Sequence, residues 1–149
     1  MRSLLIMLSL FMGAAQAASA ADTCSAPDAN FAAFLDRFKN DQAFQRERIL
    51  YPLQFTSSEP DAKGGTLETK ASLTQKDIQD RAIRIIIGRT EAAPLKGGEG
   101  ALCEEEPRIS GDHATFVQYS CHTDVYGYEF EFVRKQGCWF LQRLATSGG

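Results

Sequence analysis

The sequence predicts a disulfide-bonded α+β domain in which N-terminal helices pack on one face of an antiparallel sheet. Three observations lead to this fold class. Apolar residues recur with a helical period after residue 28, strand-like alternation and turns fill the last third of the chain, and the four cysteines follow a segment typical of exported proteins.

Residues 1–20 have the pattern of a secretory signal peptide. An arginine precedes an apolar run over residues 4–12 that a single serine interrupts, and small residues follow with Ala-x-Ala patterns ending at Ala17 and Ala20. The run is far shorter than the roughly 20 apolar residues of a membrane-spanning helix. We therefore expect cleavage after Ala20, with Ala17 as the second choice, and one mature domain over residues 21–149 that is periplasmic or secreted.

The mature chain is mildly acidic. The formal net charge is −3 at pH 7, and it becomes −4 when the signal segment is removed with its single arginine. A chain with this balance lacks the basic surface that nucleic-acid binding requires. No second apolar stretch is long enough to span a membrane. The glycine-rich residues 96–100, which include a lysine, match neither a P-loop nor a dinucleotide motif, so we expect no cofactor.

All four cysteines lie after the predicted cleavage site, and an even number in an exported chain predicts two disulfides. If a hairpin turn is centred near Gly111, Cys103 lies opposite Cys121 or its neighbour, near bridging distance. We therefore prefer Cys103–Cys121 together with Cys24–Cys138, while the other two connectivities stay open. The spacing of the cysteines and histidines does not suit a metal ion, so we expect no metal site.

The segment after the signal peptide predicts two helices and a strand. An apolar stripe at i, i+3, i+4 and i+7 is formed by Phe31, Phe34, Leu35 and Phe38. We expect Asp28 to cap this helix, and Asn40-Asp41 to end it and to cap a second, short helix. Pro52 stops helical continuation, and the alternation from Tyr51 to Phe55 predicts a strand.

The middle of the chain is less regular. Residues 56–65 are polar and contain proline and glycine, which predicts a loop or hairpin tip, and residues 67–73 predict a strand. Thr74 and Asp77 resemble a capping box that opens a helix. The isoleucine-rich residues 83–87 suit a buried strand, with a longer helix through them as the alternative.

The last third of the chain predicts an antiparallel meander. A turn at residues 110–112 separates a short strand from a second strand over residues 114–121. From Tyr126 to Phe132, aromatic residues alternate with a glycine and two glutamates, which gives a strand with one aromatic and one acidic face. Residues 138–144 are expected to form the last strand.

Two blocks of the sequence resemble a family of uncharacterised exported bacterial proteins. The first block is Phe31-x-x-Phe34-Leu35-x-x-Phe38, followed by Gln45-x-x-Arg48-x-x-Tyr51-Pro52-Leu53, and the second is Tyr128-x-Phe130-x-x-Val133 with Gly137-Cys138-Trp139-x-Leu141. The resemblance implies a nuclear-transport-factor-2-like fold, in which a curved antiparallel sheet wraps around helices to form a cone. It also implies an envelope location, and it implies no catalytic activity.

A few residues are candidates for a binding site inside such a cone. Arg48 could form a salt bridge across the helix–strand junction, or it could point into the cone and hold an anionic group. Glu129 and Glu131 share one strand face: on a solvent face they would serve solubility, and inside a cone they would form a paired-carboxylate site. Tyr119 and Tyr128 would be hydrogen-bond donors in the same pocket.

Two functional hypotheses follow. The first is a non-enzymatic periplasmic or secreted binding or interaction protein, whose partner is another envelope protein or a small ligand. The alternative is a small-molecule acid–base enzyme, isomerase-like or hydrolase-like, that uses the cone-shaped pocket. His113 and His122 are weaker catalytic candidates because both adjoin turns. The orientation of Glu129 and Glu131 separates the hypotheses, since only inward-facing carboxylates favour an enzyme.

Overall fold

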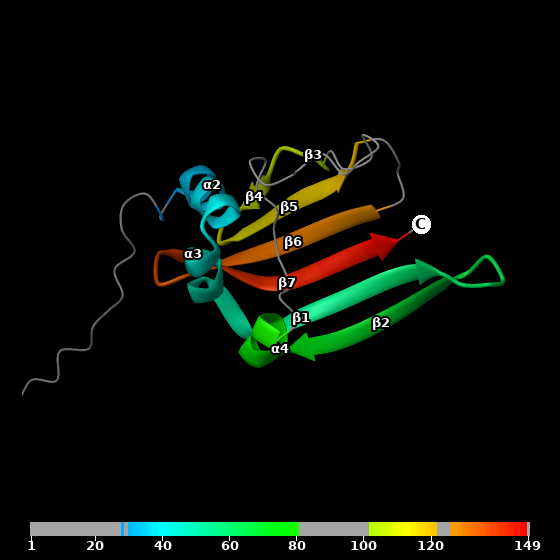
Figure 1. Ribbon diagram of the computed structural model, residues 1–149. Helices are drawn as coiled ribbons and strands as arrows, with labels where there is room; N and C mark the ends of the chain where they lie inside the picture. Colours follow the sequence, from blue (N-terminus) through cyan, green and yellow to red (C-terminus); the bar gives the residue numbers. More distant parts are fainter. Residues whose placement is uncertain (1–27, 29, 81–101, 122–125, 149) are drawn as a thin grey trace, which may run out of the picture.

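The computed structural model describes Asp28 and residues 30–80, 102–121 and 126–148, which form a curved sheet with short helices beside it (Figure 1). The predicted signal peptide, Cys24 and the isoleucine-rich run at 83–87 lie outside the described residues. The strands are β1 (Ile49–Pro60), β2 (Thr66–Leu73), β3 (Leu102–Glu104), β4 (Arg108–Ser110), β5 (His113–Ser120), β6 (Tyr126–Lys135) and β7 (Cys138–Gly148).

The described strands form one seven-stranded sheet with the order β2-β1-β7-β6-β5-β3, and β4 pairs with β5 beside β3. Every pairing is antiparallel except the one between β1 and β7, which is parallel. The sequence predicts an antiparallel sheet, so the parallel pairing of β1 with β7 differs from that prediction. It arises because the first strand after the helices enters the sheet beside the last strand of the chain.

Helix α2 (Phe31–Asn40) follows the predicted apolar stripe, but its cap is a different residue. The side chain of Asn30 accepts hydrogen bonds from the backbone N–H groups of Ala32 at 3.0 Å and Ala33 at 3.2 Å. The prediction that Asp28 caps this helix is wrong. The carboxylate of Asp28 instead forms ion pairs with two arginines, described below.

A second short helix, α3 (Gln42–Glu47), begins where the sequence predicts. Asp41 caps it, accepting a hydrogen bond from the backbone N–H of Phe44 at 3.0 Å. Just after α3, the carbonyl of Arg48 accepts a hydrogen bond from the N–H of Leu141 at 2.8 Å. This bond places the end of α3 against β7 and starts the parallel pairing of β1.

The core lies between α2 and the sheet. Phe34 and Phe38 are fully buried, and their rings meet the ring of Phe132 edge-on, with centroids 5.6 and 5.4 Å apart. Phe31 contacts Phe132 and Trp139 in the same way. Such edge-to-face contacts are the favoured geometry of aromatic pairs. We call the sheet face that α2 covers the inner face, and the opposite one the outer face.

The β1–β2 hairpin is longer than the sequence predicts. Thr56 to Pro60 continue β1, and the turn contains only residues 61–65. The carboxylate of Asp61 accepts hydrogen bonds from the N–H groups of Lys63 at 2.8 Å and Gly65 at 2.7 Å, which fixes the turn. Of the predicted loop or hairpin tip over 56–65, the hairpin tip is present but shorter. Residues 56–60 are strand because β1 pairs with strands on both sides, and this backbone pairing extends β1 despite its polar side chains.

Helix α4 (Gln75–Asp80) begins with the predicted capping box. The N–H of Thr74 donates to the carboxylate of Asp77 at 2.8 Å, and the N–H of Asp77 donates to the Thr74 hydroxyl at 3.2 Å. Ile78 of this helix is buried in the core. No helix in the described part of the chain is long and apolar enough to cross a membrane.

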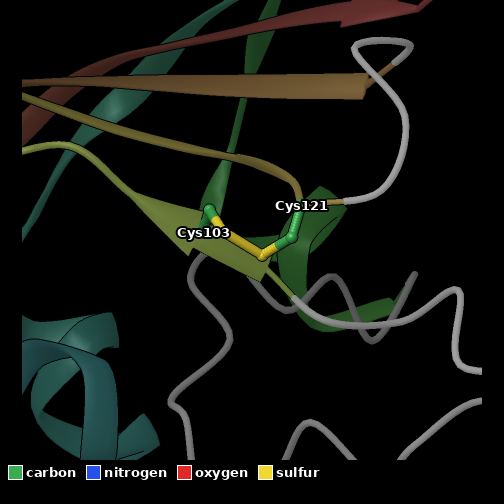
Figure 2. Close-up of a disulfide and its surroundings, with 2 residues drawn as sticks. All are labelled: Cys103 and Cys121. Carbon is green, nitrogen blue, oxygen red and sulfur yellow. A yellow bond between two sulfur atoms is a disulfide. The ribbon is translucent and has the colours of Figure 1, made fainter.

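The predicted β4–β5 hairpin and one of the predicted disulfides are confirmed. Arg108 pairs with Thr115 across the turn, and Cys103 and Cys121 are bonded with their Cα atoms 5.1 Å apart (Figure 2). The backbone partner of Cys103 is Tyr119, so the bridge runs diagonally to the end of β5. Cys138 is buried and disulfide-bonded, and its predicted partner Cys24 lies outside the described residues.

Candidate functional site

The inner face carries a small group of polar side chains at the border of the aromatic core, which we call the inner polar cluster: Lys39, Glu104 and Gln118. Lys39 comes from α2, Glu104 from β3 and Gln118 from β5. One oxygen of Glu104 accepts a bond from Nζ of Lys39 at 2.9 Å, and the other accepts one from Nε2 of Gln118 at 3.0 Å. Both carboxylate oxygens are therefore occupied by donors from two other elements.

The inner polar cluster is largely shielded from water. The side chains of Lys39 and Glu104 are 16% and 12% exposed, and Gln118 is 2% exposed. Nζ of Lys39 also lies 5.4 Å from the ring centroid of Phe116, close enough for a cation–π interaction. A buried, neutralised ion pair of this kind connects α2 to the edge of the sheet.

Sequence reasoning does not find this cluster, because Glu104 begins a run of three glutamates, and the usual interpretation of such a run is a solvated edge. Glu105 and Glu106 are exposed as that interpretation requires, and Glu104 alone turns inward. A signal was present in β5. Gln118 lies two residues after the buried Phe116, on the strand face that must be buried, and a buried amide requires a hydrogen-bond partner.

A second charged group lies on the outer face, which we call the outer charged cluster: Glu129, Glu131 and Arg143. The two glutamates alternate with Phe130, whose side chain is buried on the inner face, so they point away from the helices. Nη2 of Arg143 donates to Glu129 at 3.0 Å and also to Glu131. The hydrogen bond that Arg143 donates to Glu131 raises the pKa of Arg143 above its ordinary value, and partial burial opposes this shift.

The outer charged cluster is accessible to solvent. The three side chains are between 32% and 39% exposed. The structure therefore places Glu129 and Glu131 in the water-facing arrangement, in which they do not form a paired-carboxylate site inside a cone. Each carboxylate pairs with Arg143, whose single positive charge offsets one of the two negative charges, so neither carboxylate is isolated at this position.

An open hollow of about 280 Å³ adjoins this cluster, and we call it the outer hollow. Its lining includes Ser58, Val117, Gly127, Glu129, Ala145 and Ser147. Small side chains on neighbouring strands leave the space. At Gly127 an added Cβ would come within 2.9 Å of the Ser147 hydroxyl, so a larger residue would displace that side chain and narrow the hollow.

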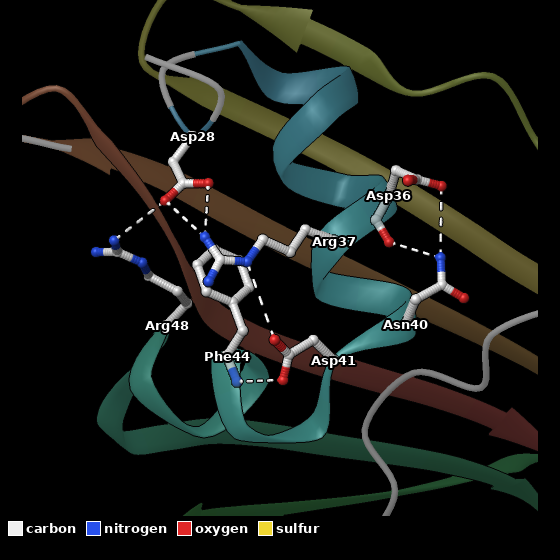
Figure 3. Close-up of polar contacts among 7 residues, drawn as sticks. All are labelled: Asp28, Asp36, Arg37, Asn40, Asp41, Phe44 and Arg48. Carbon is white, nitrogen blue, oxygen red and sulfur yellow. Dashed lines mark hydrogen bonds and ion pairs between the residues drawn. The ribbon is translucent and has the colours of Figure 1, made fainter. Parts of the chain in front are cut away.

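Arg48 is held by a structural ion pair at the start of the domain (Figure 3). The buried carboxylate of Asp28 contacts Nη2 of Arg48 at 3.5 Å and Nη1 of Arg37 at 3.4 Å. The guanidinium groups lie over the ring of Phe44, 4.0 Å from its centroid for Arg37 and 5.3 Å for Arg48. Of the two predicted roles for Arg48, the salt bridge is the one present, and its partner Asp28 precedes α2.

The two candidate tyrosines lie on opposite faces. Tyr119 faces outward beside Cys103, its backbone partner. Tyr128 faces inward, pairs with Gln118 and stacks on Phe130 with ring centroids 6.4 Å apart. The five predicted site residues thus fall in three places: Arg48 near the helix end, Tyr128 on the inner face, and Tyr119 with both glutamates on the outer face.

The remaining chemical candidates do not assemble into a site. His113 is exposed at the start of β5, and His122 lies outside the described residues. Within the described ranges no three His, Cys, Asp or Glu side chains are grouped so that they could hold a metal ion.

The fold is similar to that of an NTF2-like protein from Bacteroides fragilis, with a TM-score of 0.53 and 20% sequence identity over 80% of this chain. The chain has an NTF2-like fold. It spans 47% of the length of that protein. The resemblance inferred from the two sequence blocks is thereby confirmed at the level of the fold.

Two other similar structures are those of proteins of unknown function. One is an NTF2-like protein from Shewanella baltica, with a TM-score of 0.44 and 12% identity over 74% of this chain and 80% of that chain. Another is a DUF3225-family protein from Pectobacterium atrosepticum, with a TM-score of 0.45 and 12% identity over 83% of this chain and 91% of that chain. The sequence matches no known family in a scan of protein families, and no curated protein in a search.

Proposed function

We propose that this NTF2-like domain is an exported, non-enzymatic binding protein that recognises another envelope protein through the outer face of its sheet. The observation that carries the proposal is the outer hollow beside the outer charged cluster. Small-molecule sites usually enclose 70–90% of their ligand. A hollow that opens on a sheet face suits a protruding side chain of a protein partner better than an enclosed substrate.

The charges beside the hollow suit recognition. Arg143 shares two carboxylates, and all three side chains are partly exposed. A partner that brings a carboxylate to Arg143, or a cation to Glu129, would exchange one ion pair for another without leaving a buried charge unpaired. Such exchangeable charges contribute to specificity and association rate more than to affinity.

The same contacts argue against the acid–base enzyme. A general base needs a carboxylate that is free to accept a proton from substrate. Glu104 accepts hydrogen bonds at both oxygens, and Glu129 and Glu131 both pair with Arg143. Among the described residues, these pairings occupy the carboxylates that the enzyme hypothesis would use.

Export is the second part of the proposal. It is supported by the signal-like residues 1–20 and by the Cys103–Cys121 disulfide, because disulfides persist mainly in oxidising compartments. The mature chain would then be the single domain over residues 21–149, periplasmic or secreted. Intact mass spectrometry of the protein from a bacterial periplasm would report both the cleavage site and the mass change on reduction.

The binding face is tested by placing a photo-crosslinking residue at Ser147, which lines the outer hollow, and at Ser110 as a matched control. Both serines are exposed and lie at strand ends, but Ser110 is in β4, away from the hollow. In cells that export the protein, we expect a discrete crosslinked partner from position 147 and none from position 110.

A second variant tests the role of charge. Arg143→Glu places a third carboxylate beside Glu129 and Glu131, and we expect it to abolish the crosslink while the fold is retained. Equal crosslinking from both serines, or from neither, would refute the outer face as the binding surface. A small molecule retained in native mass spectrometry and converted by the protein would refute the non-enzymatic role.

A further inference from the structure

Strand β2 is the terminal strand of the described sheet, and it is unusually open. All of its residues except Leu73 are exposed, and they include residues on both faces of the strand. Leu67 is 59% exposed. Only β1 pairs with it among the described strands. An exposed edge strand presents a row of backbone N–H and C=O groups to any second strand of suitable register.

The outer face of β2 carries both signs of charge. Lys70 pairs with Thr56 of β1, and Glu68 pairs with Ser58, so both side chains project on the outer face. Nζ of Lys70 lies 2.7 Å from the carboxylate of Glu68, and both side chains are more than half exposed. Glu68 and Lys70 lie two residues apart on one strand face, so they can form ion pairs with an equivalent glutamate and lysine on a neighbouring strand.

The sequence of β2 is complementary to itself about Thr69. If two copies pair antiparallel with their two-fold axis at Thr69, Glu68 lies opposite Lys70 of the partner subunit, and Lys70 lies opposite Glu68 of the partner subunit. The same register places Leu67 opposite Ala71 of the partner subunit on the inner face. Opposite charges facing across strands stabilise a pairing, and a two-fold axis repeats each contact.

Neighbouring registers lose this complementarity. A register centred on Glu68 places the two copies of this carboxylate opposite each other, and one centred on Lys70 does the same for the two ammonium groups. Like charges directly opposite each other destabilise a strand pair. A shift by a single residue would place outer side chains beside inner ones and break the continuity of the two faces.

We propose that β2 pairs antiparallel with β2 of a second copy of this chain, centred on Thr69, so that one continuous sheet runs through a homodimer. This inference goes beyond the proposed function. The pairing lies in the plane of the sheet and leaves the outer hollow open on each copy. Because one strand pair buries less than the ~1,200 Å² of a standard interface, we expect the dimer to be weak and to dissociate on dilution.

The test is sedimentation velocity of the mature protein and of charge-reversed variants. Glu68→Lys and Lys70→Glu each place like charges opposite each other in the dimer, and we expect each to weaken self-association at least about tenfold. The double variant Glu68→Lys/Lys70→Glu restores opposite charges and should associate like the unmodified protein.

A mixture of the two single variants is the sharpest measurement. Glu68→Lys has two lysines on β2 and Lys70→Glu has two glutamates, so a heterodimer satisfies every charge although neither variant pairs with itself. We expect the mixture to sediment as a dimer at concentrations where each variant alone is a monomer. Both side chains are exposed, so far-UV circular dichroism should show an unchanged fold.

The inference is overturned if the unmodified protein remains a monomer up to about 1 mM, a concentration at which even a very weak dimer forms. It is equally overturned if the single variants dimerise as strongly as the unmodified protein, or if their mixture stays monomeric. None of these results bears on crosslinking through the outer hollow, so the two proposals fail separately.

Discussion

The inner polar cluster and the outer charged cluster are built from the same kinds of group in different surroundings. Each combines a cation with carboxylate oxygens, at 2.9 Å for Lys39–Glu104 and 3.0 Å for Arg143–Glu129. The inner group is packed between α2 and the sheet, and the outer group lies on an open sheet face. The buried group therefore maintains the fold, because its charges are shielded from water and depend on partners within the domain, and the exposed group is free to meet another protein.

The contrast extends to the apolar residues on the two faces. The inner face is sealed by aromatic rings, whereas the outer face beside the hollow consists of small and polar side chains. Burial of apolar area is the main favourable contribution to folding, so stability resides in the inner face. Substitutions on the outer face can consequently change recognition without unfolding the domain.

The largest expected difference between the faces is in the core. Phe132→Ala removes a fully buried ring that contacts three phenylalanines of α2, and it should lower the free energy of unfolding by about 3–5 kcal/mol. Val117→Ala on the outer face should lower it by less than about 1.5 kcal/mol. Urea denaturation of both variants checks this, and equal losses would break the distinction.

The disulfide should have the next largest effect. The bond closes a loop with a sequence separation of 18 and holds β3, which carries Glu104, against β5. Replacing both Cys103 and Cys121 by alanine should cost about 3 kcal/mol through the greater entropy of the unfolded chain. Urea denaturation measures the loss, and reductant should lower the stability of the unmodified protein at least as far, because it also breaks the disulfide of Cys138. A variant as stable as the oxidised protein would contradict the prediction.

The two clusters can be compared directly through their cations. Lys39→Met removes the ammonium group that pairs with the nearly buried Glu104 and should cost about 2–3 kcal/mol. Arg143→Met, the matched change on the exposed face, should cost about 0–1 kcal/mol.

A double variant identifies the cause. Lys39→Met/Glu104→Gln removes both charges and should recover part of the loss, because a neutral amide at position 104 can still accept the bond from Gln118. Thermal denaturation of the three variants at one pH is sufficient. If Lys39→Met and Arg143→Met were equally mild, the buried cluster would not be structural.

Features that depend on neighbours in the sequence were predictable. The helical stripe from Phe31, the cap at Asp41 and the Thr74–Asp77 capping box each involve residues within one or two helical turns, and all three are confirmed. The Cys103–Cys121 pair was also within reach, because a single hairpin turn brings the two strands together.

Features that depend on distant partners were not predictable. Asp28 has a side chain and a position that suit a helix cap, but its carboxylate pairs with two arginines and does not cap α2. Lys39 and Glu104 are 65 residues apart, and only the completed sheet brings them together. Alternation placed Glu129 and Glu131 on one strand face. Tertiary packing decides which sheet face the helices cover. It therefore also decides whether Glu129 and Glu131 face the solvent or the interior of the domain.

The smallest expected effect concerns Tyr51, whose change should not destabilise the protein. Its hydroxyl is buried without a hydrogen-bond partner among the described residues. Tyr51→Phe removes an unsatisfied polar group and keeps the ring, so the free energy of unfolding at pH 7 should stay within about 0.5 kcal/mol or rise. Urea denaturation checks this, and a loss larger than about 1 kcal/mol would show that the hydroxyl makes a stabilising contact.

The same substitution has a pH signature. Burial raises the pKa of Tyr51 above its ordinary value of 10.0, with Arg46 acting in the opposite direction. At a pH between the tyrosine pKa of the unfolded chain and the higher pKa of Tyr51 in the folded protein, the folded state keeps a proton that the unfolded state has lost. The stability of the unmodified protein therefore falls as the pH rises above 10. Tyr51→Phe has no hydroxyl at this position, so its stability does not show this fall. The stability difference between the two proteins should therefore be constant below pH 10 and shift in favour of the variant above it. A difference that stays constant to about pH 11 would show that this tyrosine titrates as it does in the unfolded chain.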